Sequence, residues 1–131
     1  MPHFSNRSRE RLLSCDSRLI TLCSDVIRHF DFSVTDGHRT EEEQDALYAV
    51  GRTMPGRIVT WARGGESIHN TSPSRAIDLA PWPIDWQDEQ RFIELGGAMM
   101  YAAWLRKIPL EWGGHWSKKK RDLPHFQVPP R

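Results

Sequence analysis

Short segments rich in strand-forming residues, each bounded by turn residues or by proline, constrain the fold of this chain more than any other sequence feature. For example, Asp36-Gly37 closes the first segment with turn chemistry, and Pro81 ends the third. The five segments are residues 32–35, 57–61, 75–80, 110–112 and 125–128. Short strands that are interspersed with helices and partly joined by tight turns predict an α+β domain, in which a small, mostly antiparallel sheet packs against helices.

Two helices are expected before the middle of the chain. Apolar residues recur at steps of three and four positions through residues 8–30, which is the period of one amphipathic helix. Thr40 is followed three positions later by Glu43, and this pair forms a capping box. The capping box predicts a second, shorter helix that ends near residue 50.

The longest helix is expected over residues 86–107. Asp85 can cap its first turn, because an aspartate side chain accepts hydrogen bonds from the unpaired N–H groups at a helix start. Gly96 and Gly97 lie inside this segment. Glycine lowers the stability of a helix, but it allows the helix to pack closely against the sheet.

Length and composition indicate a single domain that spans residues 1–131. The net charge of +1 gives no electrostatic reason to expect nucleic acid as a partner, and no apolar run is long enough to span a bilayer. We expect no stable membrane insertion, and we also expect a monomer. Cys15 and Cys23 lie too far apart along the predicted helix to form a disulfide, so both thiols are expected to be free.

Two polar segments carry residues suited to metal chemistry. His69 lies in a polar loop that leads into residues 75–80, and Asp78 interrupts the apolar residues of that strand. A carboxylate facing away from its apolar neighbours is costly unless it meets a cation, a metal or good donors. Near the C-terminus, Asp122 precedes His125 by three residues. Two histidines and one carboxylate form a ligand set of catalytic zinc, and a further carboxylate can act as general base.

These residues stand in motifs that resemble the zinc D-Ala-D-Ala carboxypeptidase and L-alanyl-D-glutamate endopeptidase family, and most closely its small phage endolysins. The resemblance covers residues 32–128, and several ordered segments are more specific together than any one motif. The family's S-x-H and A-x-D elements are found at Ser67, His69, Ala76 and Asp78, and its D-x-x-H element at Asp122 to His125. Further family-like pieces are Gly37 to Thr40 with Gln44, Leu47-Tyr48, Gly51 to Gly56, and Trp112 to Trp116.

The resemblance implies a hedgehog/D-Ala-D-Ala peptidase-like fold with a zinc ion bound by His69, Asp78 and His125. It also implies that Asp122 is the general base. In such a site, zinc polarises the scissile carbonyl, while the base takes a proton from the attacking water and passes it to the leaving amine.

Two substrate-binding roles follow from the same resemblance. Arg39 would steady a carboxylate of the substrate or the developing oxyanion, for which a planar guanidinium is well suited. Ser67 would line the site. The alternative interpretations are a surface ion pair for Arg39 and a turn-capping hydroxyl for Ser67.

The sequence departs from the common family form in three places. Pro73-Ser74 replaces a glycine that usually follows the first histidine, and the loop after His69 is two residues longer, which we interpret as a loop variant that keeps both ligands in place. Acidic residues often stand where this chain has His115 and Gln127. His115 is either a partner of a metal ligand or a solvent-facing turn residue.

The leading hypothesis is a zinc-dependent endopeptidase that cleaves the L-alanyl-D-glutamate bond of the peptidoglycan stem peptide and serves a phage as an endolysin. The basic start of the chain is not followed by the apolar core of an export signal, so we expect the protein in the host cytoplasm. It would reach the periplasmic peptidoglycan after another protein permeabilises the inner membrane. Two alternatives stay open: a D-alanyl-D-alanine carboxypeptidase, and a catalytically inactive cell-wall-binding domain of the same fold.

Overall fold

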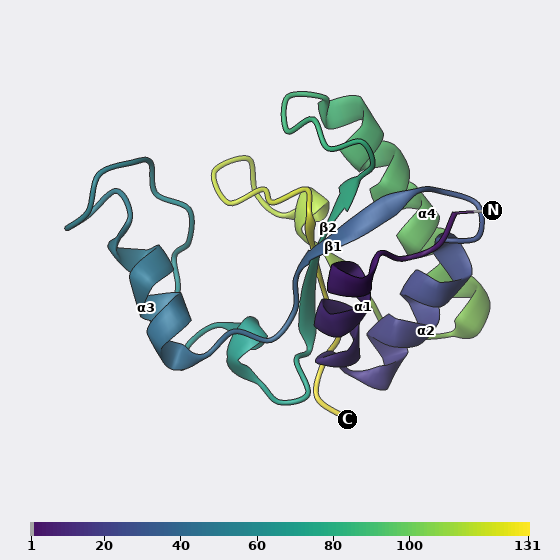
Figure 1. The fold of residues 1–131 in the computed structure, drawn as a ribbon, viewed down its shortest axis with the longest axis horizontal. Coiled ribbons are helices and arrows are strands. Elements are labelled where there is room, and N and C mark those ends of the chain that lie inside the picture. Colours follow the sequence, from purple (N-terminus) through teal and green to yellow (C-terminus); the bar gives the residue numbers. More distant parts are fainter. Residues whose placement is uncertain (1) are drawn as a thin grey trace.

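The structure is a computed structural model that describes residues 2–131, and within this range helices alternate with short strands (Figure 1). The α-helices are α1 (Asn6–Leu13), α2 (Ser17–Val26), α3 (Glu41–Ala49) and α4 (Glu89–Arg106), and two 3-10 helices are η1 (Ile68–Asn70) and η2 (Gly113–His115). The strands are β1 (Phe32–Asp36), β2 (Ala76–Pro81), β3 (Glu111–Trp112) and β4 (His125–Gln127).

The four strands form one sheet in the order β1-β2-β4-β3, and every neighbouring pair is antiparallel. The predicted α+β class with a small antiparallel sheet is therefore confirmed. Strand β2 lies in the interior of the sheet, and its Asp78 pairs in register with His125 of β4. The sheet thus brings together two residues that are far apart in the sequence.

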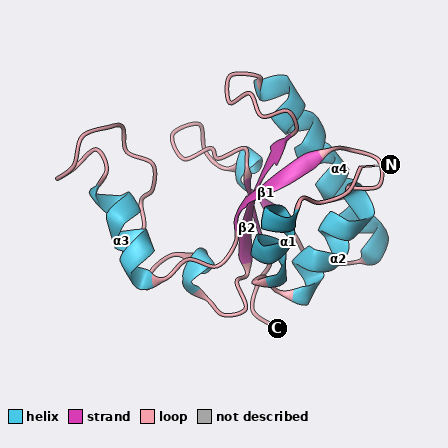
Figure 2. Cartoon of the chain, in the orientation of Figure 1, coloured by secondary structure: helices cyan, strands magenta, loops and turns pink. Residues whose placement is uncertain are grey.

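Helices α1, α2 and α4 lie together on one side of the molecule, whereas α3 stands apart and is joined to the sheet by loops (Figure 2). Helix α1 contacts β1, α2 packs against α4, and α4 contacts β2. The core between these elements is formed by fully buried side chains such as Leu19, Leu79, Met99 and Phe126. The apolar residues that recur along these helices therefore lie on the helix faces that pack into the core.

Residues 8–30 do not form the single helix that their periodicity predicted. The Asp16 carboxylate caps α2 by accepting a hydrogen bond from the backbone N–H of Arg18 at 2.9 Å. The backbone N–H of Asp16 donates to the carbonyl of Ser74, 2.8 Å away. The chain breaks here because a side-chain cap and a distant loop satisfy backbone groups that a continuous helix would pair internally.

The prediction of a strand over residues 57–61 was also wrong, because this segment is a loop. The hydroxyl of Thr60 accepts a hydrogen bond from Gln44 of α3 at 3.1 Å. The backbone carbonyl of Thr60 accepts a hydrogen bond from the side chain of Arg52 at 3.1 Å. Side chains from α3 and from the turn after it therefore satisfy polar groups of this loop, as a neighbouring strand would do in a sheet.

The long helix begins later than predicted. Helix α4 starts at Glu89 and is capped by Asp88, whose carboxylate accepts from the N–H of Arg91. Asp85 caps the preceding turn instead, where it accepts from the N–H of Gln87 at 3.0 Å. The capping box at the start of α3 is present as predicted.

Replacement of Asp16 by alanine is expected to lower the free energy of unfolding by about 2 kcal/mol, because an N-cap is lost together with buried charge-assisted bonds. The Asp16 side chain is only 7% exposed and pairs with Arg18 and Arg131. Hydrogen bonds from Arg18 hold the pKa of Asp16 well below its usual range. Its contribution is therefore complete above the unfolded pKa of about 3.9 and is lost as the pH falls through the folded pKa.

Urea denaturation measures the free energy of unfolding of the wild-type protein and of the variant. The difference between them is expected to be smaller at pH 3 than at pH 7. Asp25→Ala is the matched control, since it removes an exposed ion pair to Arg106 that contributes about 0–1 kcal/mol. A loss in the Asp16 variant no larger than in this control would contradict the role assigned to Asp16.

Cys15 and Cys23 are free thiols, as the sequence predicted. Both are buried, and this burial raises the pKa of the Cys15 thiol to about 12. In residues 2–131, none of the helices combines the length and the apolar character needed to cross a membrane.

Candidate metal centre

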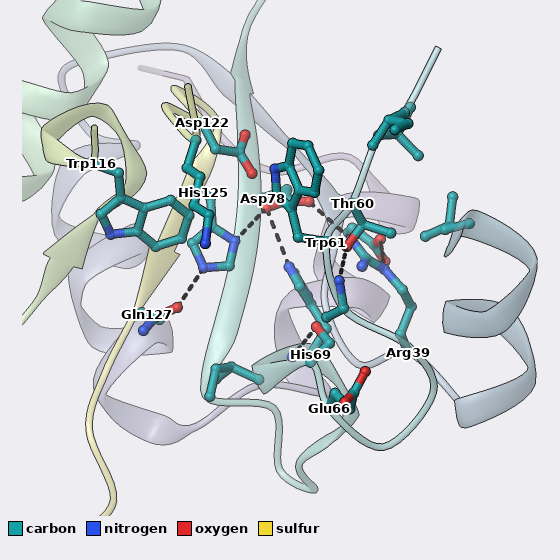
Figure 3. A pocket seen from close by; sticks show the side chains of 18 of the residues that line it. Arg39, Thr60, Trp61, Glu66, His69, Asp78, Trp116, Asp122, His125 and Gln127 are labelled. Atoms are coloured by element: carbon teal, nitrogen blue, oxygen red, sulfur yellow. Dashed lines mark hydrogen bonds and ion pairs between the residues drawn. The ribbon is translucent and has the colours of Figure 1, made fainter. Parts of the chain in front are cut away.

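The three residues predicted as metal ligands lie together at the sheet (Figure 3). Asp78 and His125 are paired on β2 and β4, and His69 comes from η1. Asp78 Oδ1 lies 3.3 Å from His69 Nε2 and 3.3 Å from His125 Nδ1. The candidate ligand atoms of all three residues lie within 4.8 Å of one another.

Hydrogen bonds on the outer side of each imidazole orient the two histidines. His69 Nδ1 is 2.7 Å from the carbonyl oxygen of Gly37, and His125 Nε2 is 2.7 Å from Gln127 Oε1. A carbonyl oxygen can only accept, so each of these ring nitrogens carries a proton. In their neutral, metal-binding form, His69 Nε2 and His125 Nδ1 direct their lone pairs toward Asp78, as in metal-ligating histidines with oriented outer partners.

The space between these atoms fits a cation. Within residues 2–131, the buried atoms His69 Nε2 and Asp78 Oδ1 have no hydrogen-bond partner. Two imidazole lone pairs directed at a carboxylate oxygen repel one another unless a positive charge lies between them. A donor set of two nitrogens and one oxygen with room for a fourth ligand is that of catalytic zinc. These residues therefore fit the metal ion that the sequence predicted.

Charge around Asp78 keeps it ionised. Burial alone would raise its pKa, but interactions with His125 and His69 outweigh burial and lower the pKa of Asp78 overall. For His125, burial alone would lower the pKa, but the neighbouring Asp78 raises it overall. An anionic Asp78 is the form that binds a metal ion.

Asp122, the predicted general base, lines the same cavity beside the three candidate ligands. Its backbone N–H donates to the carbonyl of Gly113 at 3.0 Å, and its carbonyl accepts from the N–H of His125. A Cβ at position 113 would collide with the Asp122 carbonyl, so glycine is needed for this close approach. Burial and the negative charge of Asp78 raise the pKa of Asp122.

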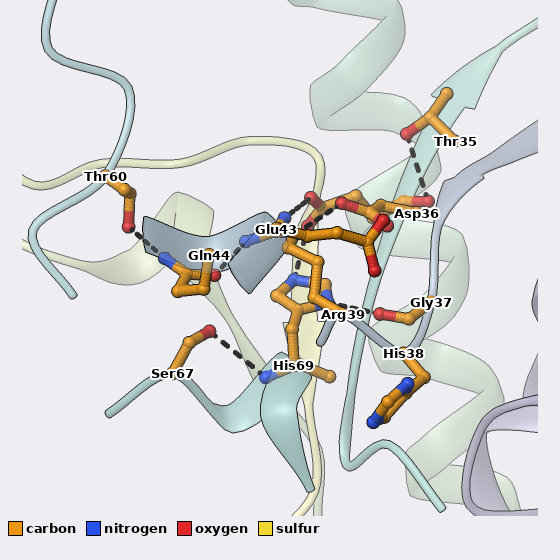
Figure 4. A network of polar contacts seen from close by, with 12 residues as sticks. Thr35, Asp36, Gly37, His38, Arg39, Glu43, Gln44, Thr60, Ser67 and His69 are labelled. Atoms are coloured by element: carbon orange, nitrogen blue, oxygen red, sulfur yellow. Dashed lines mark hydrogen bonds and ion pairs between the residues drawn. The ribbon is translucent and has the colours of Figure 1, made fainter. Parts of the chain in front are cut away.

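Arg39 lies in a buried network rather than in the surface ion pair considered from the sequence (Figure 4). Its side chain is 11% exposed and donates to Asp36 at 2.6 Å, to Gln44 Oε1 at 2.7 Å and to Asp78 Oδ2 at 3.2 Å. The guanidinium therefore holds the second oxygen of Asp78 and leaves Oδ1 facing the two histidines.

The sequence analysis noted Gln44 only as part of a family-like motif and did not predict its structural role. It is fully buried, and its Nε2 donates to Thr60 Oγ1 and to the carbonyl of Ala62 at 2.7 Å. With its Oε1 bound to Arg39, Gln44 connects the wall of the cavity to Asp78. The available signal was an uncharged polar residue among the charged residues of the first turns of that helix.

Ser67 lies at the edge of the cavity and has the capping role that was considered as the alternative. Its hydroxyl accepts a hydrogen bond from the backbone N–H of His69 at 3.1 Å and thereby caps η1. The longer loop after η1 still leaves His69 and Asp78 side by side, as the loop-variant interpretation predicted. His115 is exposed and packs edge-on against Trp112, in agreement with its interpretation as a turn residue.

The cavity in front of these residues has a volume of about 660 Å³ and is open on one side. Its far wall is the loop over residues 57–61, and Lys119 approaches the Trp61 ring of that loop at 5.5 Å from its centroid. Trp116 lies beside His125, with 5.0 Å between the ring centroids. A groove of this size can hold an extended peptide across the candidate metal centre.

The fold is shared with two solved peptidase structures. The L-Ala D-Glu endopeptidase ChiX of Serratia marcescens aligns with 97% of this chain and 90% of its own, with a TM-score of 0.75 and 26% sequence identity. The D,D-pentapeptidase VanY of a VanB-type vancomycin resistance cassette, solved in complex with Zn(II), aligns with 87% of this chain and 72% of its own. Its TM-score is 0.58 and its identity 15%, so this second likeness concerns the fold alone.

Sequence comparison identifies the family. The family model described as phage L-alanyl-D-glutamate peptidase matches residues 1–126, and this chain belongs to that family. A curated relative is the peptidoglycan L-alanyl-D-glutamate endopeptidase CwlK of Bacillus subtilis (strain 168), which is 40% identical over 110 residues. That alignment covers 76% of this chain and 62% of CwlK, so the chain spans less than two thirds of its relative. The resemblance found in the sequence motifs is confirmed.

Proposed function

We propose that this protein is a zinc-dependent endopeptidase that hydrolyses the L-alanyl-D-glutamate bond of the peptidoglycan stem peptide. The observation that carries the proposal is the convergence of His69 Nε2, His125 Nδ1 and Asp78 Oδ1 in a cavity that also holds Asp122. Membership of the phage L-alanyl-D-glutamate peptidase family and the activity in the names of CwlK and ChiX support the choice of bond. The donor set of two imidazole nitrogens and one carboxylate oxygen supports the choice of metal.

In this proposal His69, Asp78 and His125 hold the ion. When bound, zinc polarises the scissile carbonyl and lowers the pKa of the attacking water toward about 7. Asp122 accepts the proton of that water and delivers it to the leaving amine. Asp122 lines the cavity beside the three candidate ligands, so its carboxylate is placed to take this proton.

Arg39 and Ser67 complete the proposed site. Arg39 bonds to Asp36, Gln44 and Asp78 through one N–H of each nitrogen, so its remaining N–H groups can bind a substrate carboxylate or the developing oxyanion. Ser67 lines the cavity while its hydroxyl fixes the backbone of His69.

Digestion of purified sacculi tests the proposed bond. Mass spectrometry of the products is expected to find new N-terminal glutamate, and a chelator is expected to stop the reaction until zinc is added back. Release of terminal D-alanine would instead favour a D-alanyl-D-alanine carboxypeptidase. Absence of cleavage with zinc bound would favour a catalytically inactive cell-wall-binding domain.

We further propose that the protein serves a phage as an endolysin, because the family that it belongs to is one of phage peptidases. In this role it accumulates in the host cytoplasm and reaches the periplasmic peptidoglycan once a separate protein permeabilises the inner membrane. Expression in a Gram-negative host is expected to reduce turbidity only after the inner membrane has been permeabilised. Lysis without such treatment would contradict this location.

Gln127→Met is expected to weaken zinc binding by about 10–100-fold, because it removes the acceptor that orients His125. Gln127→Glu keeps an acceptor at the same place and is expected to preserve or strengthen zinc binding. Competition with a chromogenic chelator measures both affinities. Equal zinc affinity in the wild-type protein and the methionine variant would contradict the orienting role of Gln127.

A further inference from the structure

A second hollow adjoins the large cavity, and the two share Arg121 and Asp122. The second hollow has a volume of about 420 Å³ and lies between α4, the loop before α4 and the segment that precedes β4. Since Asp122 lines both spaces, a substrate that binds at the metal centre can extend past Asp122 into this hollow. Apart from Asp122, the proposed hydrolysis uses no residue of this hollow.

Trp86 forms an aromatic wall of the second hollow. It lies in the loop between β2 and α4 and is 56% exposed, although tryptophan is a large apolar residue. One face of its ring stacks on Phe92, with 5.5 Å between the ring centroids and 23° between the ring planes. Phe92 is only 3% exposed and belongs to α4. The stacking fixes the indole and leaves its other side to bind a ligand.

Polar groups surround this aromatic wall. Glu89 and Arg121 form an ion pair of 2.6 Å, which joins α4 to the segment before β4, and Gln87 lies beside them. An exposed aromatic face beside a carboxylate, a guanidinium and an amide offers both apolar contact and hydrogen bonds. This combination suits a sugar ring, whose C–H face packs on an aromatic ring while its hydroxyl and acetamido groups form hydrogen bonds.

We propose that the second hollow binds the muramic acid sugar that carries the stem peptide, with Trp86 as its stacking residue. The inference rests on the proposed function, because it places the sugar relative to the L-alanyl-D-glutamate bond. One alanine and one lactyl unit separate that bond from the sugar, a span of roughly 7 Å at about 3.6 Å per unit. A sugar subsite must therefore adjoin the metal centre, as the second hollow does through Asp122.

Two synthetic substrates test the subsite: a muramoyl peptide, and the same peptide with an acetyl group in place of the muramoyl group. Trp86→Ala is expected to lower kcat/KM for the muramoyl peptide about tenfold and to leave that for the acetyl peptide within twofold. Trp86→Phe keeps an aromatic face and is expected to restore most of the loss. Trp104→Ala is the matched control, because Trp104 is 73% exposed and lies toward the other end of α4, outside both cavities.

The outcomes separate this inference from the proposed function. A loss confined to the muramoyl peptide supports the sugar subsite. Equal losses of kcat/KM on both peptides indicate that Trp86 contacts the peptide, and no loss on either indicates that Trp86 does not contact the substrate. Both results overturn the sugar subsite and leave the proposed endopeptidase activity intact. If the zinc-loaded wild-type protein cleaves neither peptide, the proposed function fails and the subsite fails with it. Thermal unfolding of each variant verifies that the fold is retained.

Discussion

Asp122→Asn is expected to reduce hydrolysis of sacculi by about 10²–10⁴-fold or more while about one zinc ion per chain stays bound. An asparagine amide fills nearly the same volume as the carboxylate but cannot accept the proton of the attacking water. Asp122 lines the cavity beside the cluster of His69, Asp78 and His125, and it is not one of the three converging residues. Elemental analysis and turbidity assays on permeabilised Gram-negative cells measure the two quantities.

His125→Ala provides the matched comparison. It removes one of the three candidate ligands and is expected to abolish both zinc binding and hydrolysis. Together the two variants distinguish a residue that takes part in proton transfer from one that holds the metal. Full lytic activity of Asp122→Asn would remove Asp122 from the mechanism, and retention of zinc by His125→Ala would place the metal elsewhere.

Gly96→Ala is expected to lower the free energy of unfolding by about 2 kcal/mol and Tm by roughly 10 °C. Trp112 of β3 packs so closely on α4 that a Cβ at Gly96 would overlap the indole ring. The ring has no space to withdraw, because a Cβ at Gly114 would overlap it from η2 and its Nε1 donates to the carbonyl of Leu123 at 2.8 Å. The helix must therefore shift away from β3, at the cost of core packing.

Gly97→Ala is the matched control in the same helix. In the described part of the chain, residues 2–131, a Cβ at Gly97 meets no atom within 4 Å. Alanine there is therefore expected to raise the free energy of unfolding by about 0.5–1 kcal/mol through its better helix propensity. Thermal unfolding followed by circular dichroism measures both variants. Equal changes in the two variants would contradict the close packing of Trp112 on Gly96.

Local chemistry made much of the fold predictable. The capping box of α3 involves residues three positions apart, and the strands near residues 32–35, 75–80 and 125–128 were recognisable because turn residues bound them. The break between α1 and α2 was not predictable in this way. It depends on the bond between Asp16 and Ser74, and these residues are distant in the sequence.

The candidate site, too, combines features that were predictable from the sequence with contacts that were not. The sequence supplied its chemically competent residues, because two histidines and two aspartates in family-like motifs are recognisable without coordinates. It did not reveal the carbonyl of Gly37 or the amide of Gln127 as partners of the histidines. These contacts depend on which chain segments lie beside η1 and along β4.

The sequence alone thus determined which groups can bind a metal and move a proton, since residue identity fixes ligand type and protonation chemistry. Only the tertiary structure decided that His69 Nε2 and His125 Nδ1 face one oxygen of Asp78, while Arg39 holds the other. The physical reason is that lone-pair direction and burial come from contacts between segments distant in the chain, and strand register and packing set those contacts.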